Sequence, residues 1–196
     1  MRLLFKIFSS FLIANLCFFT MNGQSYNFSN FSVDKGLVQS QVLSLGQDAN
    51  DALWIATYGG VSVFDGTAFK NYSKSDGLMN NIITQVYWSS KNVMWVVSNL
   101  GITSFDGIDF VNYKFPTTKI GASPICKMIE DKNGVIWVIN NGILYQFINN
   151  EFQKKSDQEN IYLDIERLGE TVYLSSFQNG LQKINSNAEI TTVWEV

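Results

Sequence analysis

Short apolar runs separated by turn residues fill the chain from about residue 36 to its end. Leu53 to Tyr58 and Val93 to Ser98 are near-continuous runs of aliphatic, aromatic and β-branched residues, and each is followed closely by glycine or asparagine. No part of this region keeps helical apolar spacing for more than about two turns. Runs of this length, bounded by Gly, Asn and Asp, predict β-strands in an all-β chain.

The runs repeat with a period of about 41 residues. Six aromatic positions share the two intervals of 41 and 42 residues: Trp54, Trp95 and Trp137, and Phe64, Phe105 and Phe147. The period divides the chain into four units, 36–76, 77–118, 119–159 and 160–196. In the last unit Tyr173 stands where the others have tryptophan.

Each of the first three units reads as four short strands. In the first unit they are expected at 41–47, 53–58, 60–64 and 69–72, and the last two are joined by Asp65-Gly66, a dipeptide typical of tight hairpin turns. Four antiparallel strands in about 41 residues form the blade of a β-propeller. We therefore predict about four blades, a partial propeller, with the six periodic aromatic residues in its core.

The N-terminus has the order of a signal peptide. Arg2 and Lys6 precede an apolar stretch from Ile7 to Met21, which is followed by polar residues. We expect residues 1–24 to be a signal peptide that directs export to the periplasm, with an uncleaved membrane anchor as the alternative. Cys17 lies in this segment, so Cys126 is the one cysteine left and no internal disulfide can form.

Residues 25–35 have the pattern of an outer strand without a unit of its own. Tyr26 to Val33 precedes Gly36 at the offset at which the fourth strand of unit one precedes Gly77. We expect this strand to complete the last blade and close the ring, which would remove exposed sheet edges. The fourth unit, however, has its own candidate strand at 189–196. Either that segment is no strand and four blades close the ring, or the chain is the N-terminal piece of a longer propeller, the interpretation adopted here.

Composition and charge exclude several classes of function. The chain has 14 basic and 17 acidic residues, a net charge of −3, and no basic run longer than two residues, so nucleic acid is not an expected partner. It has no histidine, which excludes His-based triads and His-ligated zinc. Asp48–Asp51 and Asp131–Gly134 resemble parts of calcium loops, but they lie where turns are needed. We expect no metal and no cofactor.

Units one and two resemble a known repeat. Residues 53–66, with Leu53-Trp54-Ile55 at one end and Phe64-Asp65-Gly66 at the other, together with 69–72 and Asp76-Gly77-Leu78, are similar to the two-component regulator propeller repeat. The resemblance covers residues 26–155 and fades beyond unit two. It implies the extracytoplasmic sensor of bacterial, chiefly Bacteroidetes, signalling proteins, whose membrane helix and output domain would follow this chain.

Strand direction predicts where a ligand would bind. The loops between the fourth and first strands (d-to-a) and between the second and third strands (b-to-c) share one face, here called the loop face. Its candidate binding residues are neutral amides, hydroxyls and one aromatic: Gln39, Ser40, Gln41, Tyr58, Asn80, Asn81, Asn99, Asn140 and Asn141. Such groups suit an oligosaccharide, another uncharged polar ligand or a neighbouring domain. Cys126, aligned with Leu43 and Thr84, is expected to be a buried, inert thiol.

These observations predict a non-enzymatic sensory module that binds a ligand or a partner. Its expected partners are an oligosaccharide and the downstream domains of the same protein, with homodimerisation through the full-length protein. Two alternatives remain open at this stage: a secreted carbohydrate-active propeller enzyme, either a lyase or a glycosidase, and an exported scaffold for protein interactions.

Overall fold

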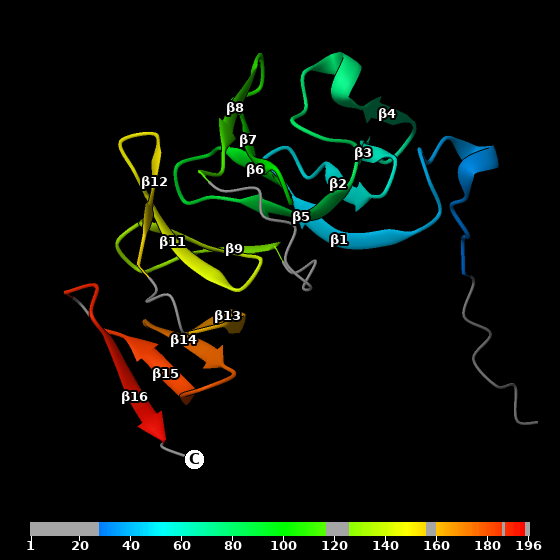
Figure 1. The fold of residues 1–196 in the computed structure, drawn as a ribbon. Helices are drawn as coiled ribbons and strands as arrows, with labels where there is room; N and C mark the ends of the chain where they lie inside the picture. The colour runs from blue at the N-terminus through cyan, green and yellow to red at the C-terminus, as the bar shows by residue number, and fades with distance from the viewer. Residues whose placement is uncertain (1–27, 117–125, 156–159, 186, 195–196) are drawn as a thin grey trace, which may run out of the picture. The chain divides into compact units, whose positions relative to one another are not determined.

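A computed structural model describes residues 28–116, 126–155, 160–185 and 187–194 of the chain. These residues form four antiparallel sheets of four strands, and within each sheet the strands lie in chain order (Figure 1). The predicted all-β fold of four-stranded blades is confirmed. The predicted signal peptide, residues 1–24, lies outside the described residues. Within the described ranges, no helix is long and apolar enough to span a membrane.

The blades are numbered in chain order. Blade 1 consists of β1 (Val42–Gln47), β2 (Leu53–Thr57), β3 (Gly60–Phe64) and β4 (Phe69–Tyr72). Blade 2 consists of β5 (Ile83–Trp88), β6 (Met94–Ser98), β7 (Gly101–Phe105) and β8 (Phe110–Lys114). Blade 3 consists of β9 (Cys126–Glu130), β10 (Ile136–Asn140), β11 (Ile143–Ile148) and β12 (Glu151–Lys154). Blade 4 consists of β13 (Tyr162–Leu168), β14 (Thr171–Ser176), β15 (Gly180–Ile184) and β16 (Ile190–Trp194).

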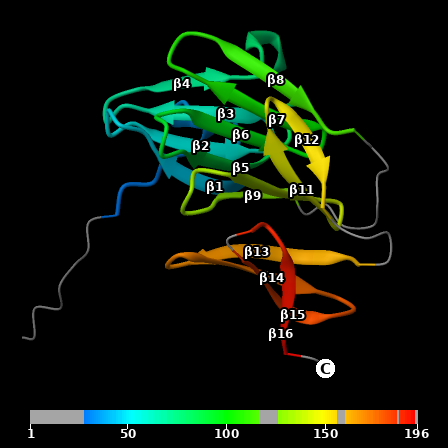
Figure 2. The ribbon, with the colours of Figure 1, turned by 90° about the vertical axis from the view of Figure 1, so that its left-hand side faces the viewer.

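The first strand of each blade is the innermost one. β1 contacts β5, β5 contacts β9, and β9 contacts β13. Figures 1 and 2 show these four strands on the inner side of the row of blades, with the fourth strands farther out. Residues at the start of β1, β5 and β9 are thereby brought together although they are far apart in sequence.

Apolar side chains fill the spaces between successive blades. Trp54 packs with Met94 and Val96 of blade 2, and Trp137 packs with Leu174 of blade 4. All residues of β6 and β10 are buried, as expected for a strand covered on both faces. Of the six periodic aromatic residues the tryptophans are buried, whereas the phenylalanines are only partly buried: Trp54, Trp95 and Trp137 against Phe64, Phe105 and Phe147.

A repeated pair of side-chain hydrogen bonds holds the connection that leads into a blade. In blade 1 the Asn71 amide donates to the Gly36 carbonyl over 2.9 Å and accepts the Ser62 hydroxyl over 2.6 Å. In blade 2 the same contacts are made by Asn112, Gly77 and Thr103. Gly36 and Gly77 have φ of 108° and 115°, so an ordinary side chain is disfavoured there. The periodic Asn and Gly residues are therefore structural.

The N-terminal segment differs from the expected outer strand, whereas the C-terminal segment contains a strand and so decides between the two alternatives for residues 189–196. Residues 28–32 form no strand, and Val33–Lys35 form a 3-10 turn, η1. The outer strand expected in 25–35 is thus not formed in its described part, where each described sheet already has a fourth strand of its own. Pairing of this segment with a blade stays a prediction. Residues 189–196 do contain a strand, β16, so the alternative in which they form none is wrong.

The first strands of three blades contain a β-bulge, and this changes the expected alignment of Cys126. The pairing of strands one and two shifts by one residue at Leu43 in blade 1, at Thr84 in blade 2 and at Leu163 in blade 4. Blade 3 has no such bulge, and Cys126 pairs with Asn140 as Val42 and Ile83 pair with the equivalent residues of their blades. The alignment of Cys126 with Leu43 and Thr84 is therefore wrong by one residue, because their two blades contain an extra residue there.

Candidate ligand-binding site

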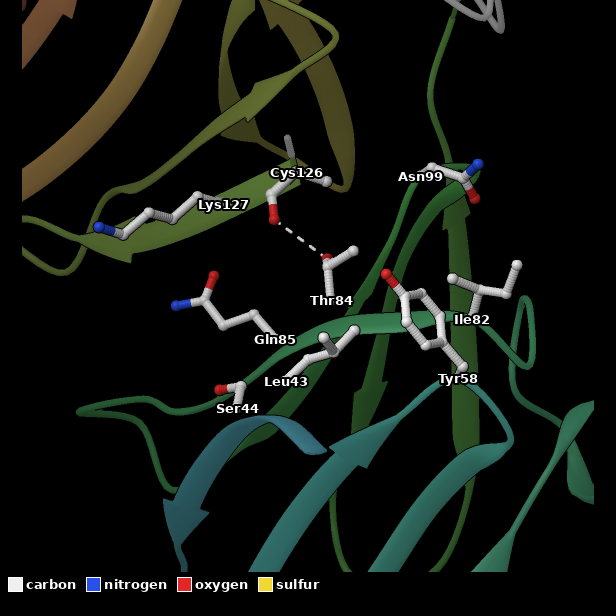
Figure 3. Close-up of a pocket in the computed structure, with 9 residues that line it drawn as sticks. All are labelled: Leu43, Ser44, Tyr58, Ile82, Thr84, Gln85, Asn99, Cys126 and Lys127. Carbon is white, nitrogen blue, oxygen red and sulfur yellow. Dashed lines mark hydrogen bonds between the residues drawn. The ribbon is translucent and has the colours of Figure 1, made fainter. Parts of the chain in front are cut away.

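A pocket of about 480 Å³ opens where the first strands of blades 1, 2 and 3 meet. It is lined by Leu43, Ser44, Tyr58, Ile82, Thr84, Gln85, Asn99, Cys126 and Lys127 (Figure 3). Most of these residues come from β1, β5 and β9 or the position just before β5, whereas Tyr58 and Asn99 come from b-to-c loops. We call this site the central pocket.

Two bulges place side chains in the central pocket. A bulge adds a residue to one strand and changes the direction in which its side chain points. Leu43 and Thr84 are the extra residues of β1 and β5, and both line the pocket. The Thr84 hydroxyl donates to the Cys126 carbonyl over 3.0 Å, a contact drawn in Figure 3, so it fastens blade 2 to blade 3 at the pocket wall.

An accessible, partly aromatic surface lies on one side of the pocket. Leu43 is 42%, Tyr58 46% and Ile82 42% exposed. Figure 3 shows Tyr58, Ile82 and Asn99 on the side away from Lys127. The Asn99 side-chain oxygen accepts the Asn80 amide over 3.0 Å, which orients the Asn99 side chain and leaves its own N–H₂ group as a donor.

The polar groups opposite this surface are largely occupied. The Gln85 amide donates to the Met128 carbonyl over 2.9 Å and accepts the Met128 N–H over 2.6 Å. Lys127 forms ion pairs of 2.9 Å with Asp164 and Glu166 of blade 4. Burial alone would lower the pKa of Lys127, but hydrogen bonds to these two carboxylates outweigh it and raise the pKa. The ammonium group is therefore protonated, and the two carboxylates compensate its positive charge.

Cys126 is an inert part of the pocket floor. It is 5% exposed, and burial raises the pKa of its thiol far above the usual value, against a smaller opposing effect of a hydrogen bond with Thr84. A thiol that remains protonated is a poor nucleophile and a poor metal ligand. The described residues also contain no group of three or more Cys, Asp or Glu side chains placed to hold a metal ion.

The structure brings only part of the predicted set together. Tyr58 and Asn99 line the central pocket, whereas the other seven predicted residues do not: Gln39, Ser40, Gln41, Asn80, Asn81, Asn140 and Asn141.

Local contacts account for several of these seven residues. The Gln39 amide donates to the side-chain oxygen of Gln41 over 3.2 Å. The Asn81 side-chain oxygen accepts the Lys74 N–H over 2.7 Å. Asn140 is 1% exposed. The contacts of Gln39, Gln41 and Asn81 thus stabilise their own loops, and Asn80 orients Asn99, so these side chains do not form the pocket wall.

Sequence reasoning did not predict the other seven residues of the pocket, which lie in the first strands or just before one of them. These are Leu43, Ser44, Ile82, Thr84, Gln85, Cys126 and Lys127. The period showed that they occupy similar places at the start of a first strand, and this was the available signal. It did not show that the first strand is the innermost one.

Comparison with known proteins defines the fold. The extracellular domain of BT3049 from B. thetaiotaomicron, described as a hybrid two-component system, matches with a TM-score of 0.67 and 23% identity over 85% of this chain and 24% of that one. The extracellular domain of BT4673 from the same organism matches with a TM-score of 0.63 and 20% identity over 79% and 24%. The chain has the blade fold of these extracellular domains. The predicted resemblance is confirmed at the level of fold.

The comparison also includes an enzyme. Virginiamycin B lyase from Staphylococcus aureus matches with a TM-score of 0.64 and 14% identity over 80% of this chain and 56% of the lyase. The chain spans about a quarter of the length of the two extracellular domains. No protein-family model and no curated protein sequence matches it.

Proposed function

We propose that this chain is a sensory module that binds an uncharged polar ligand, such as an oligosaccharide, in the central pocket. The observation that supports this most is the exposed Tyr58 ring, which lies in the pocket beside the oriented amide of Asn99. An aromatic face packs on the C–H face of a sugar ring, and an amide hydrogen-bonds to its hydroxyl groups. Because the positive charge of Lys127 is already paired with two carboxylates, the pocket favours a neutral ligand over an anion.

The place of the module in a signalling protein is part of the proposal. The fold shared with extracellular domains of two-component systems, and the signal-peptide pattern of residues 1–24, support export to the periplasmic side of the membrane. Ligand binding at the central pocket would change how the blades pack against downstream domains of the same protein. This is a coupling of binding free energies between two sites.

Isothermal titration with a panel of neutral oligosaccharides tests the ligand site. Tyr58→Ala removes the aromatic surface and is expected to weaken binding about fivefold, since an aromatic stacking contact is worth about 1 kcal/mol. Phe177→Ala is the matched control, because Phe177 is 75% exposed just after β14 and does not line the pocket. Equal affinities of the two variants, with binding intact, would place the ligand elsewhere.

The enzyme alternative receives less support from the residues. A virginiamycin B lyase in which one histidine is replaced by alanine is described as catalytically inactive, and this chain has no histidine. Turnover of an oligosaccharide by the chain, abolished by a single Asp or Glu substitution, would favour an enzyme. The scaffold alternative would be favoured by a captured envelope protein together with no oligosaccharide binding.

A further inference from the structure

The Asn99 amide of the central pocket has a fixed orientation and an unused donor. Its side-chain oxygen accepts the Asn80 amide over 3.0 Å. The Asn80 side-chain oxygen in turn accepts the Asn81 N–H over 2.8 Å, which holds the N–H₂ group of Asn80 toward Asn99. Among the described residues, none accepts a hydrogen bond from the Asn99 N–H₂ group. A ligand that meets this group must therefore supply an acceptor.

Most other polar side chains of the pocket are already paired. Gln85 uses both ends of its amide on one backbone position of blade 3, and Lys127 is paired with two carboxylates of blade 4. The Thr84 hydroxyl is shared between two backbone carbonyls at 3.0 and 3.2 Å. The Ser44 hydroxyl accepts a backbone N–H of blade 2 over 3.3 Å. Directed recognition of a ligand thus depends most on Asn99.

Exposed carbon surface lies on the same side of the pocket as Asn99. Ile82 is 42% and Tyr58 46% exposed, and Figure 3 shows both on this side. Leu43, which is also 42% exposed, lines the same pocket. Covering aliphatic surface with a methyl group removes both from water and favours binding. The ligand group expected at Asn99 therefore combines an acceptor oxygen with a methyl group close to it.

The acetamido group of an N-acetylhexosamine has this combination. Its carbonyl oxygen accepts hydrogen bonds and carries no proton that needs a partner, whereas a sugar hydroxyl in the same place would bring its O–H to the aliphatic surface. Its methyl group is two bonds from that oxygen, so both can be placed at one site. A deoxyhexose supplies a methyl group without the carbonyl, and an unsubstituted hexose supplies hydroxyl groups only.

We propose that the central pocket selects an N-acetylhexosamine residue of its oligosaccharide, an inference that rests on the proposed sugar-binding function. The acetamido carbonyl accepts from the Asn99 N–H₂ group, the methyl group packs on Ile82, and the sugar ring packs on Tyr58. Asn80 is a positioning residue, because it orients Asn99 without lining the pocket. The acetamido group is neutral, which agrees with the paired charge of Lys127.

Isothermal titration with two matched pairs of sugars tests the selection. The pairs are N,N′-diacetylchitobiose with cellobiose, and N-acetyl-D-galactosamine with D-galactose. In at least one pair the acetamido sugar should bind about tenfold more tightly, as expected for one added hydrogen bond and one covered methyl group. Equal affinities within both pairs would overturn the selection and leave the sugar-binding function standing. No binding of any of the four sugars would also overturn it, and the wider oligosaccharide panel then decides whether the proposed function fails as well.

Asn99→Asp tests the donor. The substitution keeps an oxygen that accepts from Asn80 but replaces the N–H₂ group by a second oxygen, so the preference for the acetamido sugar should fall to about twofold or less. Asn133→Asp makes the same change in the exposed turn between β9 and β10, away from the pocket, and should keep the preference. General damage to the fold would weaken both sugars of a pair equally. An unchanged preference in Asn99→Asp would contradict the proposal.

Two further variants test the orientation and the methyl contact. Asn80→Ala frees the Asn99 oxygen, so the amide can turn either group toward the ligand, and the preference should fall while the sugar without the acetamido group keeps its affinity. Ile82→Ser removes the aliphatic surface from an exposed position just before β5 and should lower the preference in the same way. A preference that survives in both variants would mean that the acetamido group is recognised elsewhere.

Discussion

The carboxylates of Asp48 and Asp131 each lie in a turn and accept a hydrogen bond from the indole of the tryptophan six positions later. The second oxygen of Asp48 also accepts the backbone N–H groups of Asn50 and Ala52, and Asp131 makes the equivalent contacts. One side chain thus closes the turn and fixes the orientation of an indole in the space between two blades. The position of these segments between two strands predicts turns, and the indole contact explains why each turn has an aspartate.

Asp48→Ala is expected to lower the free energy of unfolding by about 1–3 kcal/mol, because it leaves the buried Trp54 N–H without its acceptor. The change can be measured by urea denaturation. Asp109→Ala, in an exposed turn, is the control and should stay within about 0.5 kcal/mol of the unchanged chain. Equal effects of the two substitutions would show that the aspartate–indole contact contributes nothing to stability.

The candidate site illustrates what residue types can and cannot predict. Tyr58 and Asn99 were found because they lie in loops of the predicted face. Gln41 and Asn81 lie on the same face, yet the Gln41 side chain accepts from Gln39 and Asn81 accepts from Lys74. A sequence shows which groups can form hydrogen bonds. It does not show which of them are already satisfied within the loop.

Strands and turns were predictable because each repeats a local signal. The hairpin turns follow from Asp65-Gly66 and Asp106-Gly107, and Gly66 and Gly107 have φ of 95° and 103°. The bulges in β1 and β5 carry no such signal, because one extra residue in an apolar strand leaves the composition unchanged. For this reason the pocket residues Leu43 and Thr84 were not found, and Cys126 was misaligned.

The hairpin turns also predict a dependence of stability on pH. The backbone N–H groups of Ala68 and Thr67 lower the pKa of Asp65 below its usual value of 3.8, and those of Asp109 and Ile108 do the same for Asp106. Because the folded pKa is the lower one, this stabilisation is present above about pH 3.8 and is lost as the pH falls through the folded pKa.

The double variant Asp65→Asn, Asp106→Asn is therefore expected to show a smaller loss of stability on acidification than the unchanged chain. The measurement is the urea midpoint as the pH is lowered from neutral to below 3.8, because the folded carboxylates become protonated only below that value. Asp109→Asn serves as the control and should follow the unchanged chain. Parallel curves for the double variant and the unchanged chain would contradict the assignment of the acid sensitivity to these turns.

Across the described blades, the contacts that join one blade to another run mainly between neighbours in chain order. The three hydrophobic clusters lie between blades 1 and 2, 2 and 3, and 3 and 4, and the ion pairs of Lys127 and Lys132 join blade 3 to blade 4. In such an arrangement stability is approximately a sum of blade terms and nearest-neighbour terms. A defect at one interface should therefore affect the adjoining blades most.

Leu174→Ala tests this arrangement. Leu174 is fully buried in β14, in the cluster shared with Trp137 and Ile139 of blade 3. Its truncation should destabilise the interface of blades 3 and 4 by about 2–5 kcal/mol. Hydrogen exchange should then show a larger loss of protection in β13–β16 than in β1–β8. Leu168→Ala, at a position 64% exposed, should change little. An equal loss of protection in all blades would instead mean that they unfold as one cooperative unit, so that the nearest-neighbour description fails.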